Sequence, residues 1–276
     1  MKNRLLFGTG GAPLSASARS TVSGIRRIKE LGLECMEVEF VHGVKMSAQL
    51  AAEVKLTASE CGVALSVHAP YAINLNSVDT AKIEASKQRL IEAARVGALC
   101  GARNVVLHAA FYGSMSSPAT HETVRHNLQD VVDMVSLTNT QVCLRPELMG
   151  KDSQYGTLDE ILQLCSDIKG IAPAIDFAHW HARSGRFNTY EEFASILGKV
   201  MERLGPQALK DLHVHVSGIE YGRHGELKHV NLSESDFDYQ ALLRALKDAA
   251  AAGLVICESP NLEGDAVLLK KAFEAL

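Results

Sequence analysis

Short apolar runs alternate with amphipathic segments along nearly the whole chain, and this alternation limits the possible folds more than any other feature. The runs are rich in Val, Ile and Leu, as expected of parallel strands buried on both faces. With their exit loops, the predicted strands occupy residues 5–11, 35–41, 64–71, 104–110, 141–147, 171–177, 209–218 and 254–260. Helical spacing of apolar residues predicts helices at 15–31 (starting at Ser15 or Ser17), 50–62, 80–101, 120–137, 158–168, 190–204, 239–251 and 262–273. A long polar loop is predicted between strand seven and the helix that begins at 239.

Eight strand–helix units in 276 residues predict a single (β/α)8 TIM barrel, and we expect residues 1–276 to form one domain. No Pro/Ser-rich linker or shift in composition divides the chain. The alternative is an open, doubly wound sheet, in which a glycine-rich phosphate-binding loop would follow an early strand. The segment Gly8-Thr-Gly-Gly11 is too short for that loop and lacks its third glycine.

Composition restricts the environment in which the protein works. No apolar run approaches the roughly 20 residues needed to cross a bilayer, so no membrane partner is expected. The N-terminus lacks the apolar region of a signal peptide. The six cysteines are scattered without a CxxC pair, as is typical of reduced thiols in a cytoplasmic protein. A net charge of −4 counts against non-specific binding of nucleic acid, but it does not exclude an enzyme whose metal ions contact a phosphate. We expect a monomer.

Residues that bind metals recur where predicted strands end. Apolar residues 171–175 lead directly into Asp176, His179 and His181. A carboxylate and an imidazole three residues apart can both be presented by a strand end and the turn that follows it. For this segment alone, the alternative is a polar loop with two incidental histidines.

Strands three to eight each deliver such a residue to the same rim, because the C-terminal ends of barrel strands lie at one face. A single histidine at a strand end is usually only a polar end residue, but six coincidences at one face are much less frequent. Burying so many carboxylates and imidazoles without a cation would also be unfavourable. Mixed ligands without thiolates suit Zn²⁺, Mn²⁺ or Fe²⁺. The candidates are His68, His108, Glu147, Asp176, His179, His213 or His215, His229 and Glu258; Glu37 and Glu39 also share one side of strand two.

These segments resemble the endonuclease IV type of AP endonuclease within the xylose isomerase-like barrel superfamily. The similarity runs through nearly the whole chain and is most specific in Val67-His-Ala-Pro-Tyr71 and Asp176-Phe-Ala-His179. It implies a barrel with three zinc ions that hydrolyses DNA 5′ to an abasic site, so DNA is the expected partner. The zinc ligands would be His68, His108, Glu147, Asp176, His179, His213, His229 and Glu258.

The resemblance also implies individual roles. Glu147 would be the catalytic residue, because it would bridge two metals beside the attacking hydroxide. Apart from the resemblance, Tyr71, His181 and His215 are the expected substrate contacts; His181 has no counterpart in the family motif and is also a candidate for contacting a metal ligand.

Two segments depart from the family pattern. The family's loop pair Asp-Arg-His is replaced by Leu227-Lys228-His229, so the Asp ligand is missing, and the adjacent Glu226 is out of phase with it. We therefore expect two or three zinc ions, with Mn²⁺ or Fe²⁺ as the alternative metals. The family's Asn-Pro-Arg loop, which inserts into DNA, corresponds here to Phe40-Val-His-Gly-Val-Lys-Met46, which contains no Arg.

Two other functions fit parts of the pattern. A sugar isomerase or epimerase of the same superfamily would hold one Mn²⁺ with Glu147, Asp176 and Glu258 beside His179 and His213, while Glu147 moves a proton. A non-catalytic protein that binds metal or nucleic acid would have no need of an open ligand cluster. The number of bound ions separates the two enzymes, because isomerisation needs one ion and phosphoester hydrolysis uses two or three.

Overall fold

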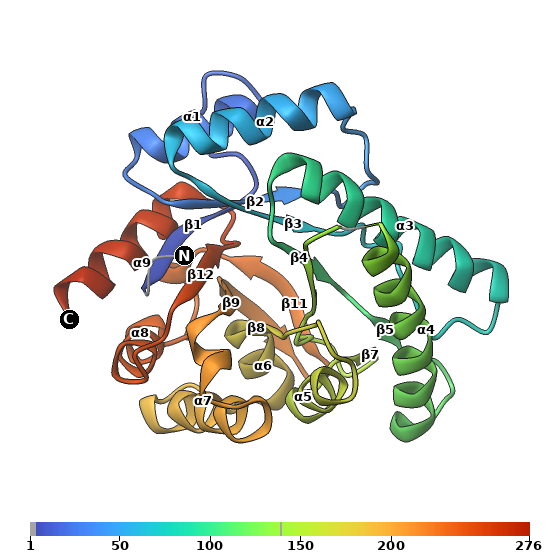
Figure 1. Ribbon diagram of the computed structural model, residues 1–276. Helices are drawn as coiled ribbons and strands as arrows, with labels where there is room; N and C mark the ends of the chain where they lie inside the picture. The colour runs from blue at the N-terminus through green and yellow to red at the C-terminus, as the bar shows by residue number, and fades with distance from the viewer. Residues whose placement is uncertain (1–3, 139) are drawn as a thin grey trace.

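The computed structural model describes residues 4–138 and 140–276, and its centre is a sheet of eight parallel strands. The strands follow one another in the order β6-β4-β3-β2-β1-β12-β9-β8. Isolated parallel bridges pair Leu144 with Ile171 and Glu147 with Ala174, and they connect the outer strands β6 and β8. The sheet therefore closes around the centre of the molecule (Figure 1), and the predicted (β/α)8 barrel is confirmed. The strands are β1 (Leu5–Gly10), β2 (Cys35–Glu39), β3 (Ala64–His68), β4 (Asn104–Leu107), β6 (Cys143–Pro146), β8 (Ala174–Asp176), β9 (Leu212–Val216) and β12 (Gly253–Cys257).

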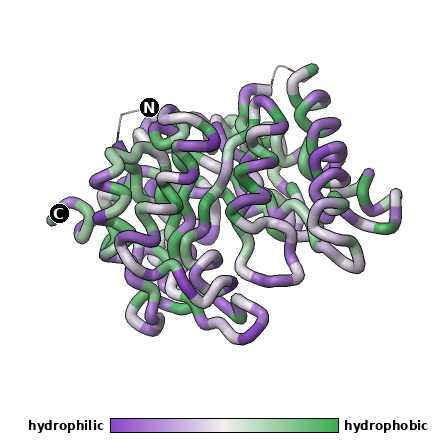
Figure 2. The backbone as a smooth tube through the Cα atoms, turned by 90° about the horizontal axis from the view of Figure 1, so that it is seen from below, coloured by the Kyte–Doolittle hydropathy of each residue, from purple (hydrophilic) through white to green (hydrophobic). Residues whose placement is uncertain are grey.

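Helices cover the outside of the barrel (Figure 1). Hydrophobic and hydrophilic residues alternate along them, as the view from below shows (Figure 2), because one face of each packs on the sheet and the other contacts solvent. The helices are α1 (Thr21–Glu30), α2 (Ala48–Cys61), α3 (Thr80–Cys100), α4 (Ser117–Leu137), α5 (Leu158–Asp167), α6 (Phe177–Ser184), α7 (Tyr190–Leu204), α8 (Tyr239–Asp248) and α9 (Glu263–Ala275).

Local sequence signals explain several helix ends. Capping boxes begin α5 and α7, where Thr157 pairs with Glu160 and Thr189 with Glu192. The first helix begins later than predicted, because the side chain of Ser20, rather than that of Ser15 or Ser17, accepts a hydrogen bond from a backbone N–H of the first turn.

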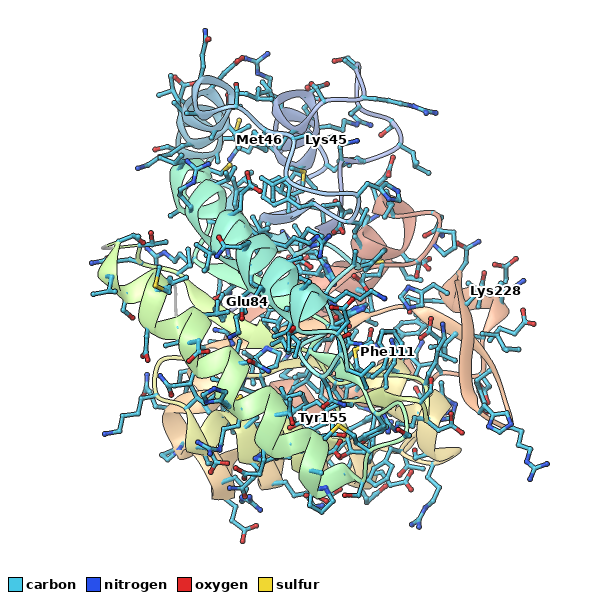
Figure 3. The ribbon with its side chains drawn as sticks, turned by 90° about the vertical axis from the view of Figure 1, so that its right-hand side faces the viewer. Lys45, Met46, Glu84, Phe111, Tyr155 and Lys228 are labelled. Atoms are coloured by element: carbon cyan, nitrogen blue, oxygen red, sulfur yellow. The ribbon has the colours of Figure 1, made fainter. Side chains whose placement is uncertain are left out.

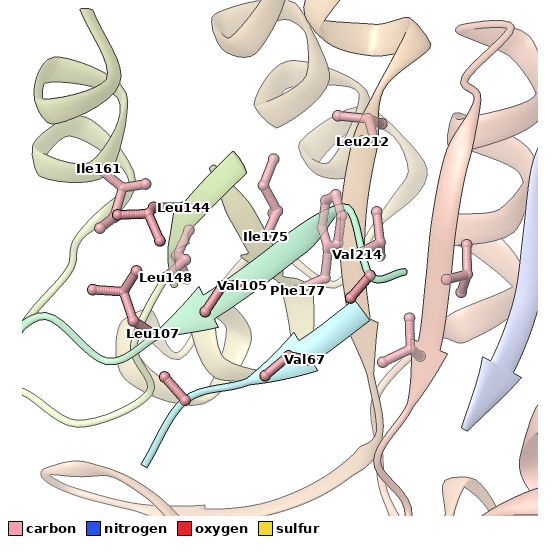
Figure 4. Packing of buried hydrophobic residues seen from close by; sticks show 14 of the residues in the cluster. Val67, Val105, Leu107, Leu144, Leu148, Ile161, Ile175, Phe177, Leu212 and Val214 are labelled. Atoms are coloured by element: carbon pink, nitrogen blue, oxygen red, sulfur yellow. The ribbon is translucent and has the colours of Figure 1, made fainter. Parts of the chain in front are cut away.

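The strands separate two apolar layers. Outward residues such as Val67, Val105, Ile175 and Val214 pack against the helices (Figure 4). A smaller cluster of Leu6, Cys35, Leu254 and Ile256 fills the floor inside the barrel. Successive side chains of a strand point to opposite faces. Inward positions nearer the C-terminal strand ends are therefore free to carry polar groups without weakening the outer layer.

Two segments differ from their prediction. The turn expected after Asp176 is the short helix α6, because Asp176 is its N-cap and accepts a 2.7 Å hydrogen bond from the backbone N–H of His179. The polar loop expected after strand seven contains an antiparallel hairpin of β10 (Gly218–Gly222) and β11 (Gly225–Val230). A second two-stranded ribbon joins β5 (Ala110–Phe111) to β7 (Gln154–Tyr155). Both ribbons lie beyond the C-terminal ends of barrel strands.

None of the helices in the described ranges has the length and apolar character needed to cross a membrane. The six cysteines, all within the described part of the chain, are free thiols, as their scattered spacing predicts.

We predict that Gly8→Ala lowers the free energy of unfolding by about 3 kcal/mol, because overpacking a close approach forces the backbone apart. A Cβ atom at this position of β1 would lie 1.7 Å from the carbonyl oxygen of Cys35 on β2. Gly198→Ala in α7 is the control: nothing lies within 4 Å of its Cβ position, and alanine should stabilise the helix by up to about 1 kcal/mol. Urea unfolding of both variants measures the difference, and equal stability of the two would contradict this account of the β1–β2 contact.

Candidate metal centre

Glu147 lies at the centre of a buried group of imidazoles. It follows β6 and is 1% exposed. Its Oε2 atom lies 3.0 Å from Nε2 of His108 and 3.3 Å from Nε2 of His68. Its Oε1 atom lies 3.3 Å from Nδ1 of both His179 and His215. One carboxylate therefore reaches ligands on two sides, which is the arrangement that a bridging ligand requires.

The first group of ligands comes from β3, β4 and β6. Side-chain atoms of His68, His108 and Glu147 lie within 4.8 Å of one another. Tyr71 supports this group, because its ring stacks on His108 with centroids 5.3 Å apart and meets the edge of His68 at 5.4 Å. The predicted association of these residues is therefore present in the structure.

The second group shares Glu147 and adds ligands from three further strand ends. Atoms of Glu147, Asp176, His215 and Glu258 lie within 4.8 Å of one another. Oδ2 of Asp176 is buried and makes no hydrogen bond within the described residues. Its contact with Nδ1 of His179 is long, at 3.4 Å, and because a buried carboxylate oxygen without a hydrogen bond is costly, this oxygen fits a metal ligand. Carboxylates and one imidazole suit Zn²⁺ or Mn²⁺.

The third group lies at the start of α6 and on the hairpin. Asp176, His179 and His229 offer atoms within 4.8 Å of one another. The Nε2 atoms of His179 and His229 are 3.1 Å apart, so the two ring nitrogens face each other and could bind one ion between them. His229 was predicted as a loop ligand, and β11 brings it to the site.

The structure places His215, rather than His213, beside Glu147. Both histidines face the barrel interior, as predicted, but His213 lies one inward position deeper along β9. Its Nε2 atom is 3.0 Å from Oε2 of Glu37, and its Nδ1 atom is 3.2 Å from the amide nitrogen of Asn104. The residues alone left the strand-seven ligand open between these two histidines, and the resemblance implied His213; it is His215, an expected substrate contact, that lies beside Glu147.

Glu37 orients His215 toward the second group. Its Oε1 atom lies 3.0 Å from Nε2 of His215, and Ser66 donates a 2.6 Å hydrogen bond to its Oε2 atom. The other nitrogen of His215, Nδ1, then faces Glu147. A carboxylate on the far nitrogen of a ligating histidine fixes the ring and raises its basicity. The alternation of Glu37 and Glu39 in the sequence indicated a shared inward face, but it did not indicate this partner.

Charges in the site are strongly coupled. Burial opposes ionisation of Glu147, but the neighbouring His108 and His215 hold its pKa well below its usual range. Burial raises the pKa of Asp176 to about 6 and that of Glu39 to about 8. Burial lowers the pKa of His68, but its contact with Glu147 and the charge of Glu39 outweigh this, and the pKa is about 10. A divalent cation would have to displace the imidazole protons that now balance these carboxylates.

An open cavity of about 380 Å³ leads from the barrel mouth to the ligands. Exposed faces of Tyr71 and Phe111 and the side chain of Lys151 line it. Tyr71 therefore lies where a substrate contact was predicted. The cavity wall also contains His68, His108, Glu147, Met149, Gln154, His179, Glu226, His229 and Glu258.

His181, expected to contact either substrate or a metal ligand, lies outside the cavity wall. It is buried, with Nδ1 3.0 Å from the carbonyl oxygen of Arg186 and Nε2 3.3 Å from Oδ1 of Asp236. Its ring meets the edge of Tyr221 on β10, with centroids 5.0 Å apart. His181 therefore supports the hairpin, and its spacing of two from His179 places it on another side of α6.

Comparisons with known proteins give one family and two kinds of structural neighbour. Residues 25–276 match the model of the xylose isomerase-like TIM barrel family. The chain is 44% identical to an uncharacterized protein of Methanocaldococcus jannaschii, over 99% of this chain and 98% of that protein. It is 24% identical to a probable endonuclease 4 of Mycoplasma genitalium, over 79% of this chain and 74% of that protein.

Two solved structures have equally similar folds. Endonuclease IV from Thermus thermophilus gives a TM-score of 0.74 at 18% identity, covering 97% of this chain and 98% of that one. A D-tagatose 3-epimerase-like protein also gives 0.74 at 18% identity, covering 97% and 96%. At this identity the similarity describes the fold alone.

We predict that His215→Gln lowers the zinc content by about one ion per chain, whereas His213→Gln leaves it unchanged, because only His215 faces Glu147. Both variants should lose about 1–3 kcal/mol of stability, since each removes a partner of the buried Glu37. Elemental analysis after zinc loading and dialysis, combined with thermal unfolding, measures both effects. Loss of zinc from His213→Gln alone would show that the strand-seven ligand has been assigned to the wrong histidine.

Proposed function

The chain belongs to the xylose isomerase-like TIM barrel family, and we propose that it is a metal-dependent phosphodiesterase that cleaves DNA 5′ to abasic sites. The observation that carries this proposal is the position of Glu147 between two ligand groups. One of its oxygens faces His68 and His108, and the other faces His179 and His215. A second ion beside His68 and His108 would make both oxygens of this carboxylate metal ligands.

In the proposed reaction the metals would stabilise negative charge, and the protein would hold the metal ligands in position. When bound, the ions lower the pKa of water and stabilise the attacking and leaving oxygens of an in-line displacement at phosphorus. Glu147 fixes both ligand groups relative to each other. Glu37 holds the ring of His215 in the orientation in which Nδ1 faces that centre. These contacts preorganise the site before a phosphate arrives.

Three side chains at the cavity mouth suit a nucleic acid. Tyr71 and Phe111 are 54% and 43% exposed, and large exposed aromatic faces stack on bases or on an exposed sugar. Lys151 places an ammonium group in the wall of the same cavity. In a complex with DNA, this group would contact a backbone phosphate. These residues supply contacts that the Arg-free segment 40–46 does not.

A sugar epimerase is the second candidate, because one group alone forms a complete site for a single ion. Glu147, Asp176, His215 and Glu258 offer four ligands around one position. In that enzyme His68 and His108 would contact the substrate instead of a second metal.

We predict that the zinc- or manganese-loaded protein nicks a duplex with one abasic site on its 5′ side, leaving a 3′-hydroxyl. Glu147→Gln should slow this reaction at least about 100-fold, because it removes a ligand common to both groups. The matched control is Glu220→Gln on β10, where the carboxylate is exposed and its one ion pair within residues 4–138 and 140–276 is with Lys228 at 3.0 Å. Gel electrophoresis of labelled duplex measures the rates, and intact duplex with zinc, manganese and iron in turn would refute the proposal.

His108→Gln separates the two candidate enzymes. In a phosphodiesterase it should remove about one metal ion per chain and slow cleavage at least about 100-fold, because the first ligand group loses a member. In an epimerase the single ion remains, because His108 is outside the four-ligand group. Metal content and interconversion of ketohexoses, measured on wild type and variant, decide between them.

A further inference from the structure

A carboxylate of the hairpin reaches one of the two histidines at the outer edge of the metal centre. Oε2 of Glu226 lies 3.5 Å from Nε2 of His179, which lies 3.1 Å from Nε2 of His229. Ligand atoms around a tetrahedral zinc with bonds of about 2.0–2.1 Å are roughly 3.3 Å apart. The two separations are close to that value, and all three residues line the same cavity wall.

A β-bulge turns Glu226 inward. Along the hairpin Glu220 is opposite Lys228 and Tyr221 is opposite Glu226, so Leu227 has no opposite residue. In a regular strand, residues 226 and 229 would face opposite sides. One extra residue shifts the alternation by one position, which brings Glu226 to the side of His229.

Exposure agrees with this geometry. Leu227 is 60% exposed, and the side chain of Lys228 is 65% exposed. Lys228 lies on the outer part of the hairpin, away from the body of the barrel (Figure 3). The side chains of Glu226 and His229 are only 15% and 23% exposed. The bulge therefore separates two outward residues from two inward ones.

Close backbone contacts hold the bulged strand in place. The backbone N–H of Glu226 donates a 3.0 Å hydrogen bond to the carbonyl oxygen of Gly150. A Cβ atom at Gly225 would lie 2.0 Å from that oxygen, and Gly225 has a positive φ of 93°. A Cβ atom at Gly150 would lie 2.8 Å from Cβ of Glu226 and 3.0 Å from Cδ2 of His179. Glycines at both positions allow the hairpin to approach the site.

We propose that Glu226 is a ligand of the ion held by His179 and His229, and that it takes the place of the aspartate absent at position 227. The proposal rests on the metal centre of the proposed function and completes its third position. Asp176 offers a further oxygen to this group. Because the bulge points residue 227 to solvent, the family's aspartate would not reach the ion in this chain.

Metal counting on the full-length protein tests this assignment independently of catalysis. After loading with zinc and removal of free metal, native mass spectrometry should give about three ions per chain for the wild type and about two for Glu226→Gln. Glu220→Gln, an exposed glutamate on the same hairpin, should retain three. Circular dichroism of each metal-free variant checks that it is folded.

A second pair of variants tests the bulge itself. Leu227→Asp should hold about three ions, and Glu226→Gln combined with Leu227→Asp should hold about two, because residue 227 faces away from the histidines. The assignment would be overturned if Glu226→Gln kept three ions or if the double variant regained the third ion. It would also be overturned if the wild type held only two ions. Absence of DNA cleavage with these counts intact would refute the phosphodiesterase alone.

Discussion

The arrangement of the barrel mouth depends on the contacts between the buried carboxylate of Glu147 and four imidazoles. Such a concentration of charge is tolerated only within a rigid frame that satisfies each group. The frame comes from strand alternation, because outward residues such as Val67 and Val214 pack on the helices and leave the inward positions free. The apolar floor around Ile256 closes the barrel below the site.

Much of this arrangement follows from the sequence. The alternating apolar runs predicted eight parallel strands, and helix α7 has the predicted bounds, since the capping box of Thr189 and Glu192 gives a strong local signal. Strand ends also predicted the ligand types that meet at the mouth. The choice between His213 and His215 did not follow, because residues two apart share one face of a strand. Their depth depends on the register of β9 against its neighbours.

The hairpin is a second feature whose geometry does not follow from the sequence pattern. Position 226 is out of phase with His229 in any regular strand, and only the bulge at Leu227, formed by pairing with β10, places both on one side. Similarly, Asp176 is both a candidate ligand and the N-cap of α6, and the sequence predicted only the first of these roles.

The central claim is that Glu147 is shared by two metal ions. Crystals of the zinc-loaded protein, measured above and below the zinc absorption edge, test it directly. The account predicts two anomalous peaks about 3.5–4 Å apart on either side of the Glu147 carboxylate, one beside His68 and His108 and the other beside Asp176, His215 and Glu258. A single peak within the four-ligand group, with none beside His68 and His108, would contradict it.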